Sequence, residues 1–190
     1  MDKFREYKIV PDIIDDRPVE VLSVQWKRTR TKCYPGDTLT PTQVHTIPVI
    51  DWRARHECLH TIVFVHLGPV GEPVDEELHW LVFNVPGENM VKGQVHAEYL
   101  ESGPGEGTGF HRYVYLVYRQ ESKIDPFSKF PYKPRRLDGR KPWNTREFAK
   151  KCNLGEPIAG NFYLAEFDES VPGFIQEITG STGHFLDDSD

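Results

Sequence analysis

Short apolar runs separated by proline and glycine constrain the fold of this chain more than any other feature. The run Thr61-Ile62-Val63-Phe64-Val65 is β-branched or aromatic throughout, which is typical of a strand covered on both faces. Comparable runs span residues 19–26, 81–85, 113–118 and 162–167. The 15 prolines and 15 glycines interrupt these runs at short intervals, which favours stacked sheets over alternating strand–helix units. We therefore predict a mainly β fold.

Two short helices are also indicated. Asn144 is a good N-cap residue, and Glu147 follows it three positions later, as in a capping box. This pattern predicts a helix over about residues 145–152. A second short helix is expected after Ser170, with Pro172 in its first turn. Its apolar face would be formed by Phe174, Ile175 and Ile178.

The length of 190 residues fits one domain, which we place at residues 1–180. Residues 181–190 end in an acidic tail that we expect to lack fixed structure. With a net charge of -6, the chain is a poor candidate for non-specific nucleic-acid binding. No apolar run approaches the 18 or so residues of a membrane span.

The cellular location is predicted from the N-terminus and the cysteines. The first eight residues contain no apolar core of a secretory signal. Three widely spaced cysteines, Cys33, Cys58 and Cys152, fit reduced thiols better than a disulfide framework. We therefore expect a cytoplasmic protein, and we expect it to be a monomer without a cofactor.

A glycine-rich segment leads directly into three side chains that can contact a ligand. Residues 103–109 contain four glycines and one proline, so the backbone can turn tightly and approach a ligand closely. His111, Arg112 and Tyr113 follow at the start of one apolar strand, and His79 opens another. A histidine pair can donate hydrogen bonds to phosphate or carboxylate, and partial protonation adds attraction. The residues thus indicate a small anion pocket whose affinity falls as the pH rises.

The roles of the neighbours of His111 are less specific. Tyr113 can donate its phenolic proton to the same ligand oxygen or simply pack. For Arg112 we favour a structural role, because an arginine at the start of a strand often braces a loop. Backbone N–H groups of the glycine segment would supply further donors, as in anion-binding nests.

Segments spread along nearly the whole chain resemble the phosphatidylethanolamine-binding protein (PEBP) family, in the family's order. The resemblance extends over about residues 8–178 and implies a PEBP-like antiparallel β-sandwich with a few peripheral short helices. It also implies ligand-binding roles for His79, Pro104, His111 and Tyr113. The similar segments are residues 9–14, 39–42, 79–87, 103–113, 144–149 and 160–163.

One family motif is missing. After the strand that corresponds to Thr61–Val65, the family usually has Asp-Pro-Asp-x-Pro, whereas this chain reads His66-Leu67-Gly68-Pro69-Val70. Both carboxylates are absent from the aligned positions, which weakens the case for an ammonium head group and makes the expected pocket more electropositive. Two side chains could take the place of the missing carboxylates: His66, as a third imidazole in the pocket, or Glu72, if it reaches back to the pocket.

The resemblance implies a non-enzymatic binding module for phosphate or a phospholipid head group. Family members bind such head groups and modulate kinases or other signalling proteins, so a protein partner such as a kinase is expected. One alternative is a structural protein of the mitochondrial large ribosomal subunit, because one protein of that subunit is built on this fold and also lacks the acidic motif. Another is a hydrolase with a histidine base, although no nucleophile is evident.

Two further motifs have competing interpretations. His56-Glu57-Cys58-Leu59-His60 matches the His-Glu-x-x-His pattern of zinc proteases, but that chemistry requires a helix. On a strand, residues 56 and 60 would lie about 13 Å apart, so we predict no metal site. Residues 128–142 form a basic, proline-containing segment, which is either a solvated surface loop or a docking patch for an acidic partner.

Overall fold

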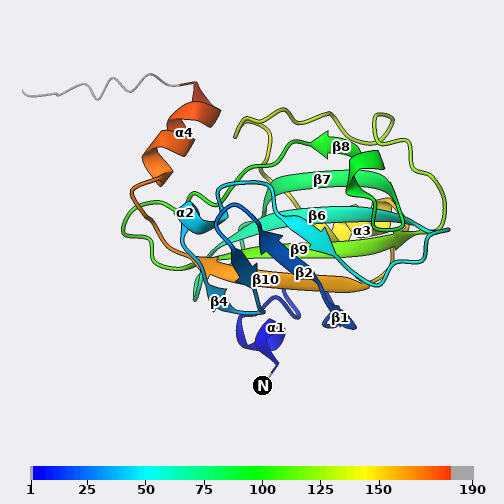
Figure 1. Ribbon diagram of the computed structural model, residues 1–190, viewed down its shortest axis with the longest axis horizontal. Helices are drawn as coiled ribbons and strands as arrows, with labels where there is room; N and C mark the ends of the chain where they lie inside the picture. Colours follow the sequence, from blue (N-terminus) through cyan, green and yellow to red (C-terminus); the bar gives the residue numbers. More distant parts are fainter. Residues whose placement is uncertain (1, 181–190) are drawn as a thin grey trace, which may run out of the picture.

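The computed structural model describes residues 2–180, and its centre is a seven-stranded sheet (Figure 1). Most neighbouring strands are antiparallel, whereas β1 and β4 run parallel to β10 at one edge. The mainly β prediction is confirmed. In order across the sheet the strands are β1 (Glu20–Val21), β10 (Ala159–Ala165), β9 (His111–Gln120), β6 (Leu59–Pro69), β7 (Glu77–Pro86) and β8 (Gln94–Ala97), and β4 (Asp37–Thr38) also pairs with β10.

A three-stranded sheet covers one face of the large sheet. It consists of β3 (Thr31–Cys33), β2 (Ser23–Trp26) and β5 (Val49–Asp51). Trp26 is fully buried between the sheets, and its ring centroid lies 5.7 Å from that of Tyr163 on β10. Aromatic burial of this kind is a major stabilising term in a sandwich core.

The prediction of a single strand over residues 19–26 is wrong, because the chain passes from the large sheet to the small sheet within this run. Residues 20–21 pair with β10, and residues 23–26 belong to the small sheet. Leu22 is buried at the crossing, where its carbonyl accepts a hydrogen bond of 2.8 Å from the Asn161 side chain. The same amide donates to the Cys33 carbonyl at 2.9 Å, so Asn161 links both sheets.

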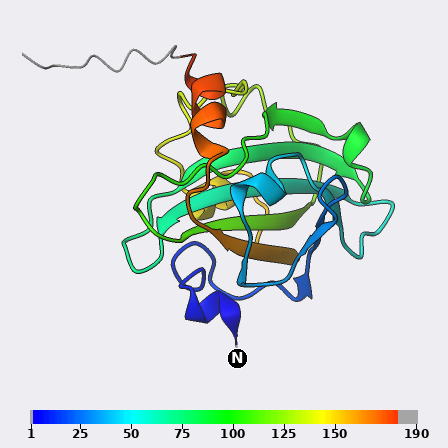
Figure 2. The same ribbon diagram turned by 60° about the vertical axis from the view of Figure 1, so that its left-hand side comes forward.

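Helices and the N-terminal segment lie around the sheets (Figures 1 and 2). The predicted helix at 145–152 is α3 (Thr145–Lys151), where Asn144 accepts from the Glu147 N–H at 2.9 Å. The second predicted helix is α4 (Val171–Thr179), whose Phe174 and Ile178 pack on Leu100. The elements not foreseen include α1 (Lys3–Glu6), α2 (Pro41–Val44) and the 3-10 turn η1 (Met90–Lys92).

Side chains of β9 alternate between two apolar layers. Tyr113, Tyr115 and Val117 face the small sheet, whereas Val114, Leu116 and Tyr118 face α3 and the N-terminal segment. Because the side-chain period of a strand is two, this alternation places His111 on the same side as Tyr113.

Within residues 2–180, no helix is long and apolar enough to cross a bilayer.

The basic segment 128–142 is irregular, as predicted, but it is not simply a solvated surface. Arg140 is 1% exposed, and its guanidinium donates to the backbone carbonyls of Leu78, Glu98 and Pro134. Arg135 pairs with the Glu101 carboxylate at 2.9 Å. The expectation of a solvated loop or an accessible basic patch is therefore wrong for Arg140, whose charge ties the segment to β7.

Replacing Arg140 with alanine should lower the free energy of unfolding by about 3 kcal/mol, because several charge-assisted hydrogen bonds to buried carbonyls are lost. Arg136→Ala is the matched control, since Arg136 is exposed in the same segment. Urea unfolding followed by circular dichroism measures both. Equal stability of the two variants would contradict the internal role of Arg140.

Candidate functional site

Strand β6 lies between β7 and β9 in the large sheet (Figure 1), and three histidines of these strands meet at one end of it. His66 Nε2 lies 2.7 Å from His111 Nδ1 across the β6–β9 pair. The Tyr113 ring stacks on His66 with a centroid distance of 4.8 Å. The same ring meets the edge of His79 at 5.7 Å. The two histidines singled out in the sequence thus belong to one cluster, and His66 joins them.

A carboxylate that the sequence analysis missed lies among these rings. Glu77 is paired with His66 across β6 and β7, and it precedes His79 by two residues, which puts both side chains on the same face. Glu77 Oε1 lies 3.1 Å from His79 Nε2 and 3.5 Å from His66 Nδ1. The Glu77 side chain is only 12% exposed. The two-residue spacing before His79 was the signal that could have identified it.

The glycine-rich segment folds back over His111. Gly107 and Gly109 adopt positive φ angles of 74° and 78°, which other residues rarely adopt. This turn places the Thr108 hydroxyl 2.6 Å from His111 Nε2 and 2.6 Å from the Gly105 carbonyl. The loop therefore covers the outer ring nitrogen of His111.

The start of this loop is packed against the cluster and against α4. Pro104 is buried, and the backbone of the preceding Gly103 faces the Tyr113 phenol. A Cβ atom at Gly103 would approach the Phe174 ring of α4 to 2.7 Å, so this glycine is required by packing. All four residues predicted to bind ligand, His79, Pro104, His111 and Tyr113, are buried in this region.

Arg112 braces the backbone beneath the cluster, as we predicted. Its guanidinium donates to the carbonyls of Leu67 at 3.2 Å and Pro69 at 3.1 Å, and it also reaches the carbonyl of Glu72. Glu72 contributes this backbone oxygen, whereas its side chain is exposed, so it does not replace the missing carboxylate. Arg112 thus fixes the turn that follows His66.

The charges of the cluster differ from those of the electropositive pocket that we expected. Burial, with the nearby charges of His66, Arg112 and Lys141, lowers the pKa of His111 to about 4. Burial also lowers the pKa of His66. Burial alone would raise the pKa of Glu77, but the adjacent His66 and His79 rings outweigh it and hold this pKa well below its usual range. At neutral pH the site therefore combines an ionised carboxylate with uncharged imidazoles at His66 and His111.

Comparison with known proteins places this cluster in a family. A model described as "Phosphatidylethanolamine-binding protein" matches residues 30–163, which include every residue of the cluster. The chain belongs to the phosphatidylethanolamine-binding protein family. This confirms the resemblance on which the predicted site residues were based, while their ligand-binding roles stay predictions.

Several PEBP relatives cover most of this chain. "Putative odorant-binding protein A5" of Drosophila melanogaster is 34% identical over 93% of this chain and 84% of its own length. The "26 kDa secreted antigen" of Toxocara canis is 35% identical over 83% of this chain and 61% of its own length. The solution structure of CG7054 is 38% identical, covers 92% of this chain and 99% of the other, and has a TM-score of 0.71.

The chain departs from the PEBP acidic motif in a way that the structure compensates. Where the family usually has the first aspartate, the chain has His66, and the carboxylate comes from Glu77 on the adjacent strand. The absence of both motif carboxylates therefore does not leave the cluster without an acidic group. On β7, Glu77 Oε1 lies 3.1 Å from His79 Nε2.

The zinc-protease pattern at residues 56–60 does not form a helix. His56 lies in an exposed turn and His60 is buried in β6.

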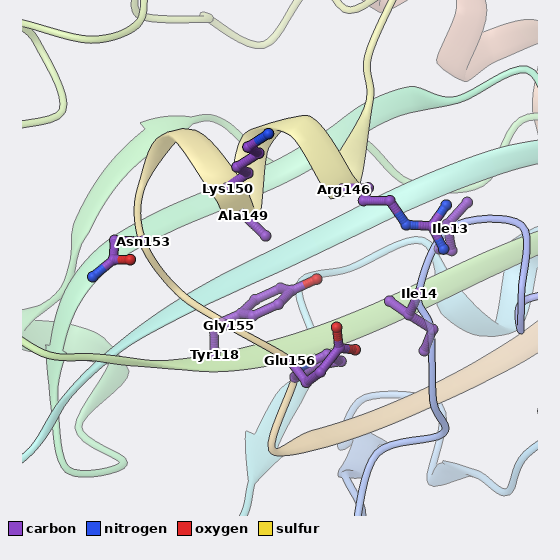
Figure 3. Close-up of a pocket in the computed structure, with 10 residues that line it drawn as sticks. Ile13, Ile14, Tyr118, Arg146, Ala149, Lys150, Asn153, Gly155 and Glu156 are labelled. Carbon is purple, nitrogen blue, oxygen red and sulfur yellow. The ribbon is translucent and has the colours of Figure 1, made fainter.

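A separate hollow of about 280 Å³ lies between α3, residues 13–14 and Tyr118 (Figure 3). Tyr118 is seven residues beyond His111 on β9, or about 23 Å along the strand, so this hollow is distinct from the cluster.

The low pKa of His111 should make the stability of the protein depend on pH. An unfolded histidine has a pKa of about 6.5. Between about pH 4 and 6.5 the unfolded chain therefore binds more protons here than the folded chain, and the free energy of unfolding should fall as the pH drops through this window. One such group contributes a slope of up to about 1.4 kcal/mol per pH unit.

Denaturant unfolding at several pH values measures this slope, and histidine NMR signals give the midpoint directly. His111→Gln should flatten the slope, and His56→Gln, at an exposed histidine outside the cluster, should leave it unchanged. A His111 midpoint near 6.5 would show that the ring is not desolvated as described.

Proposed function

We propose that this protein is a non-enzymatic binding module for a small phosphate-bearing group, such as a phospholipid head group. The supporting observation is the convergence of His79, His111 and Tyr113, with Pro104 and the glycine loop at the same end of the sheet. Membership of the PEBP family supports the same class of ligand. The relative named as odorant-binding also suggests a small-molecule ligand.

The charge of the site favours a zwitterion over a bare anion. Ionised Glu77 would repel inorganic phosphate, whereas an ammonium group on the ligand would be attracted to it. The N–H of His111 and the backbone N–H groups of the glycine loop would donate to the phosphate oxygens. Phosphoethanolamine, which carries both charges, is therefore the head group that we expect to bind.

A ligand that binds His111 Nε2 must displace Thr108, which already contacts this nitrogen. We therefore expect the loop to open when the site is occupied. Because Gly103 at the base of the loop packs against Phe174, this movement would reach α4. A protein partner that contacts α4 or the loop would then sense occupancy, which is how we propose that the protein regulates signalling.

A hydrolase is disfavoured by the hydrogen bonds of Thr108. Its hydroxyl donates to the Gly105 carbonyl, so toward His111 it can only accept. A nucleophile would need to give its proton to the imidazole, which is the reverse arrangement. Our proposal is therefore binding without turnover.

We also propose a cytoplasmic location, from the sequence features described above. One relative is named a secreted antigen, so that relative's name indicates a different location.

Isothermal calorimetry with chelator-treated protein tests the head-group site. Phosphoethanolamine should bind more tightly than inorganic phosphate at pH 7. His79→Gln should weaken its binding about tenfold or more, because the His79 nitrogen beside Glu77 is lost as a charge-assisted acceptor for the ammonium group. His96→Gln is the control, since His96 is equally buried but bonds to Phe130 outside the cluster. Equal affinity in both variants would refute the site.

Removing the competing loop contact should strengthen binding. Thr108→Ala deletes the hydroxyl that must be displaced from His111, and one hydrogen bond of about 1 kcal/mol corresponds to roughly fivefold higher affinity for phosphoethanolamine. Thr108→Ser keeps a hydroxyl and should bind as the wild type does. Weaker binding by the alanine variant would indicate that Thr108 contacts the ligand instead of competing with it.

A further inference from the structure

His66, Glu77 and His79 bring three potential metal-binding atoms together inside the cluster. Their ligand atoms all lie within 4.8 Å of one another. His66 Nδ1 is buried and has no hydrogen-bond partner, although it faces Glu77 Oε1 at 3.5 Å. An unpartnered buried nitrogen beside a buried carboxylate is uncommon, because polar groups removed from water are normally satisfied.

The hydrogen bonds on the loop side of His66 determine where the protons lie. The Thr108 hydroxyl donates to the Gly105 carbonyl, so His111 Nε2 must carry the hydrogen that joins it to Thr108. With that hydrogen on Nε2, His111 Nδ1 accepts from His66 Nε2–H at 2.7 Å. The remaining nitrogen of His66, Nδ1, therefore presents a lone pair to the Glu77 carboxylate.

The position of the ring hydrogen on His79 is determined in the same way. Its Nδ1 lies 3.0 Å from the Leu100 carbonyl, which can only accept, so the hydrogen belongs on Nδ1. Nε2 then presents a second lone pair to Glu77 Oε1 at 3.1 Å. Metal-binding histidines have this arrangement, with one ring nitrogen donating to a backbone carbonyl and the other free for the ion.

Two lone pairs directed at one carboxylate require a positive charge between them. One extra proton would serve only one of the two lone pairs, and protons on both rings would create two imidazolium ions whose ring centroids are 5.6 Å apart in a buried site. Like charges at that distance, removed from water, repel strongly. A single divalent ion satisfies all three atoms at once.

We propose that His66 Nδ1, Glu77 Oε1 and His79 Nε2 bind a zinc-class divalent cation. Two imidazoles and one carboxylate are a ligand set suited to Zn²⁺, whereas Mg²⁺ and Ca²⁺ prefer oxygen ligands alone. In a tetrahedral zinc site with bonds of about 2.1 Å, ligand atoms lie about 3.4 Å apart. The observed separations of 3.1 and 3.5 Å from Glu77 match this spacing.

This site involves residues other than those of the His-Glu-x-x-His pattern, and it replaces the prediction that the chain binds no metal. Three protein ligands leave a fourth position for water or an anion. With zinc bound, the charge of Glu77 is offset, so the site should accept inorganic phosphate better than the metal-free site does. The zinc proposal does not depend on head-group binding.

Zinc titration of chelator-treated protein against a chromophoric zinc indicator tests the proposal. The wild type should bind one Zn²⁺ per chain, and Glu77→Gln and His66→Gln should each weaken binding more than about 100-fold, exceeding the 10- to 100-fold effect of outer-shell partners. His96→Gln and Cys58→Ser should bind as the wild type does. The latter excludes the partly exposed thiol as the ligand.

A measurement on the unmodified protein guards against variants that fail to fold. Co²⁺ substituted for Zn²⁺ should give visible absorption bands without the near-ultraviolet band of thiolate ligation, and zinc should shift the NMR signals of His66 and His79 but not those of His96. Failure of the wild type to bind zinc, undiminished binding by Glu77→Gln, or loss of binding in Cys58→Ser would overturn the proposal.

The failures of the two proposals are distinguishable. Head-group binding is measured with chelator present, and zinc binding is measured without any head group. Zinc bound by a protein that ignores phosphoethanolamine would refute the head-group function alone. Phosphoethanolamine bound by a protein without affinity for zinc would refute the metal site alone. Adding zinc to the phosphate titration should increase phosphate affinity, and an unchanged affinity would show that the fourth position is closed to anions.

Discussion

Strand β6 is hydrogen-bonded along both of its edges, and the register of these two ladders decides which side chains meet. Pairing with β7 sets His66 opposite Glu77, and pairing with β9 sets it opposite Tyr113. Because a slip of one residue would turn every side chain to the other face, the apolar core on both sides fixes this register. The cluster of His66, Glu77, His79, His111 and Tyr113 is thus a consequence of core packing.

The sequence predicted the long elements well because their signals are local. Apolar β-branched runs identified the four longest strands, and the capping pattern at Asn144 located α3. Strands of two to four residues, such as β4 and β8, carry too few residues for a pattern to be recognised. Their position depends on partners distant in sequence, as does the crossing of Leu22 between the sheets.

The candidate site was only partly predictable for the same reason. His79 and His111 were found from motifs, and their proximity follows from strand order. Glu77 was missed because only residues after Thr61–Val65 were expected to replace the motif carboxylates, although alternation along a strand would have placed it beside His79. Lowered histidine pKa values were not foreseeable either, since they depend on burial by residues far apart in the chain.

Two buried arginines show how the fold holds this end of the sheet in one arrangement. Arg112 donates to carbonyls of the turn after His66, and Arg140 donates to the carbonyls of Leu78 and His79 on β7. Each guanidinium presents several N–H groups in a fixed plane, so one side chain orients several peptide groups together. The histidines that the two arginines flank are thereby positioned before any ligand binds. The Thr108 hydroxyl covers the outer ring nitrogen of His111, so in the proposed binding mode the loop is the part of the site that moves. A rigid base with a single movable cover is suited to reversible capture, because little ordering of the base is required when a ligand enters.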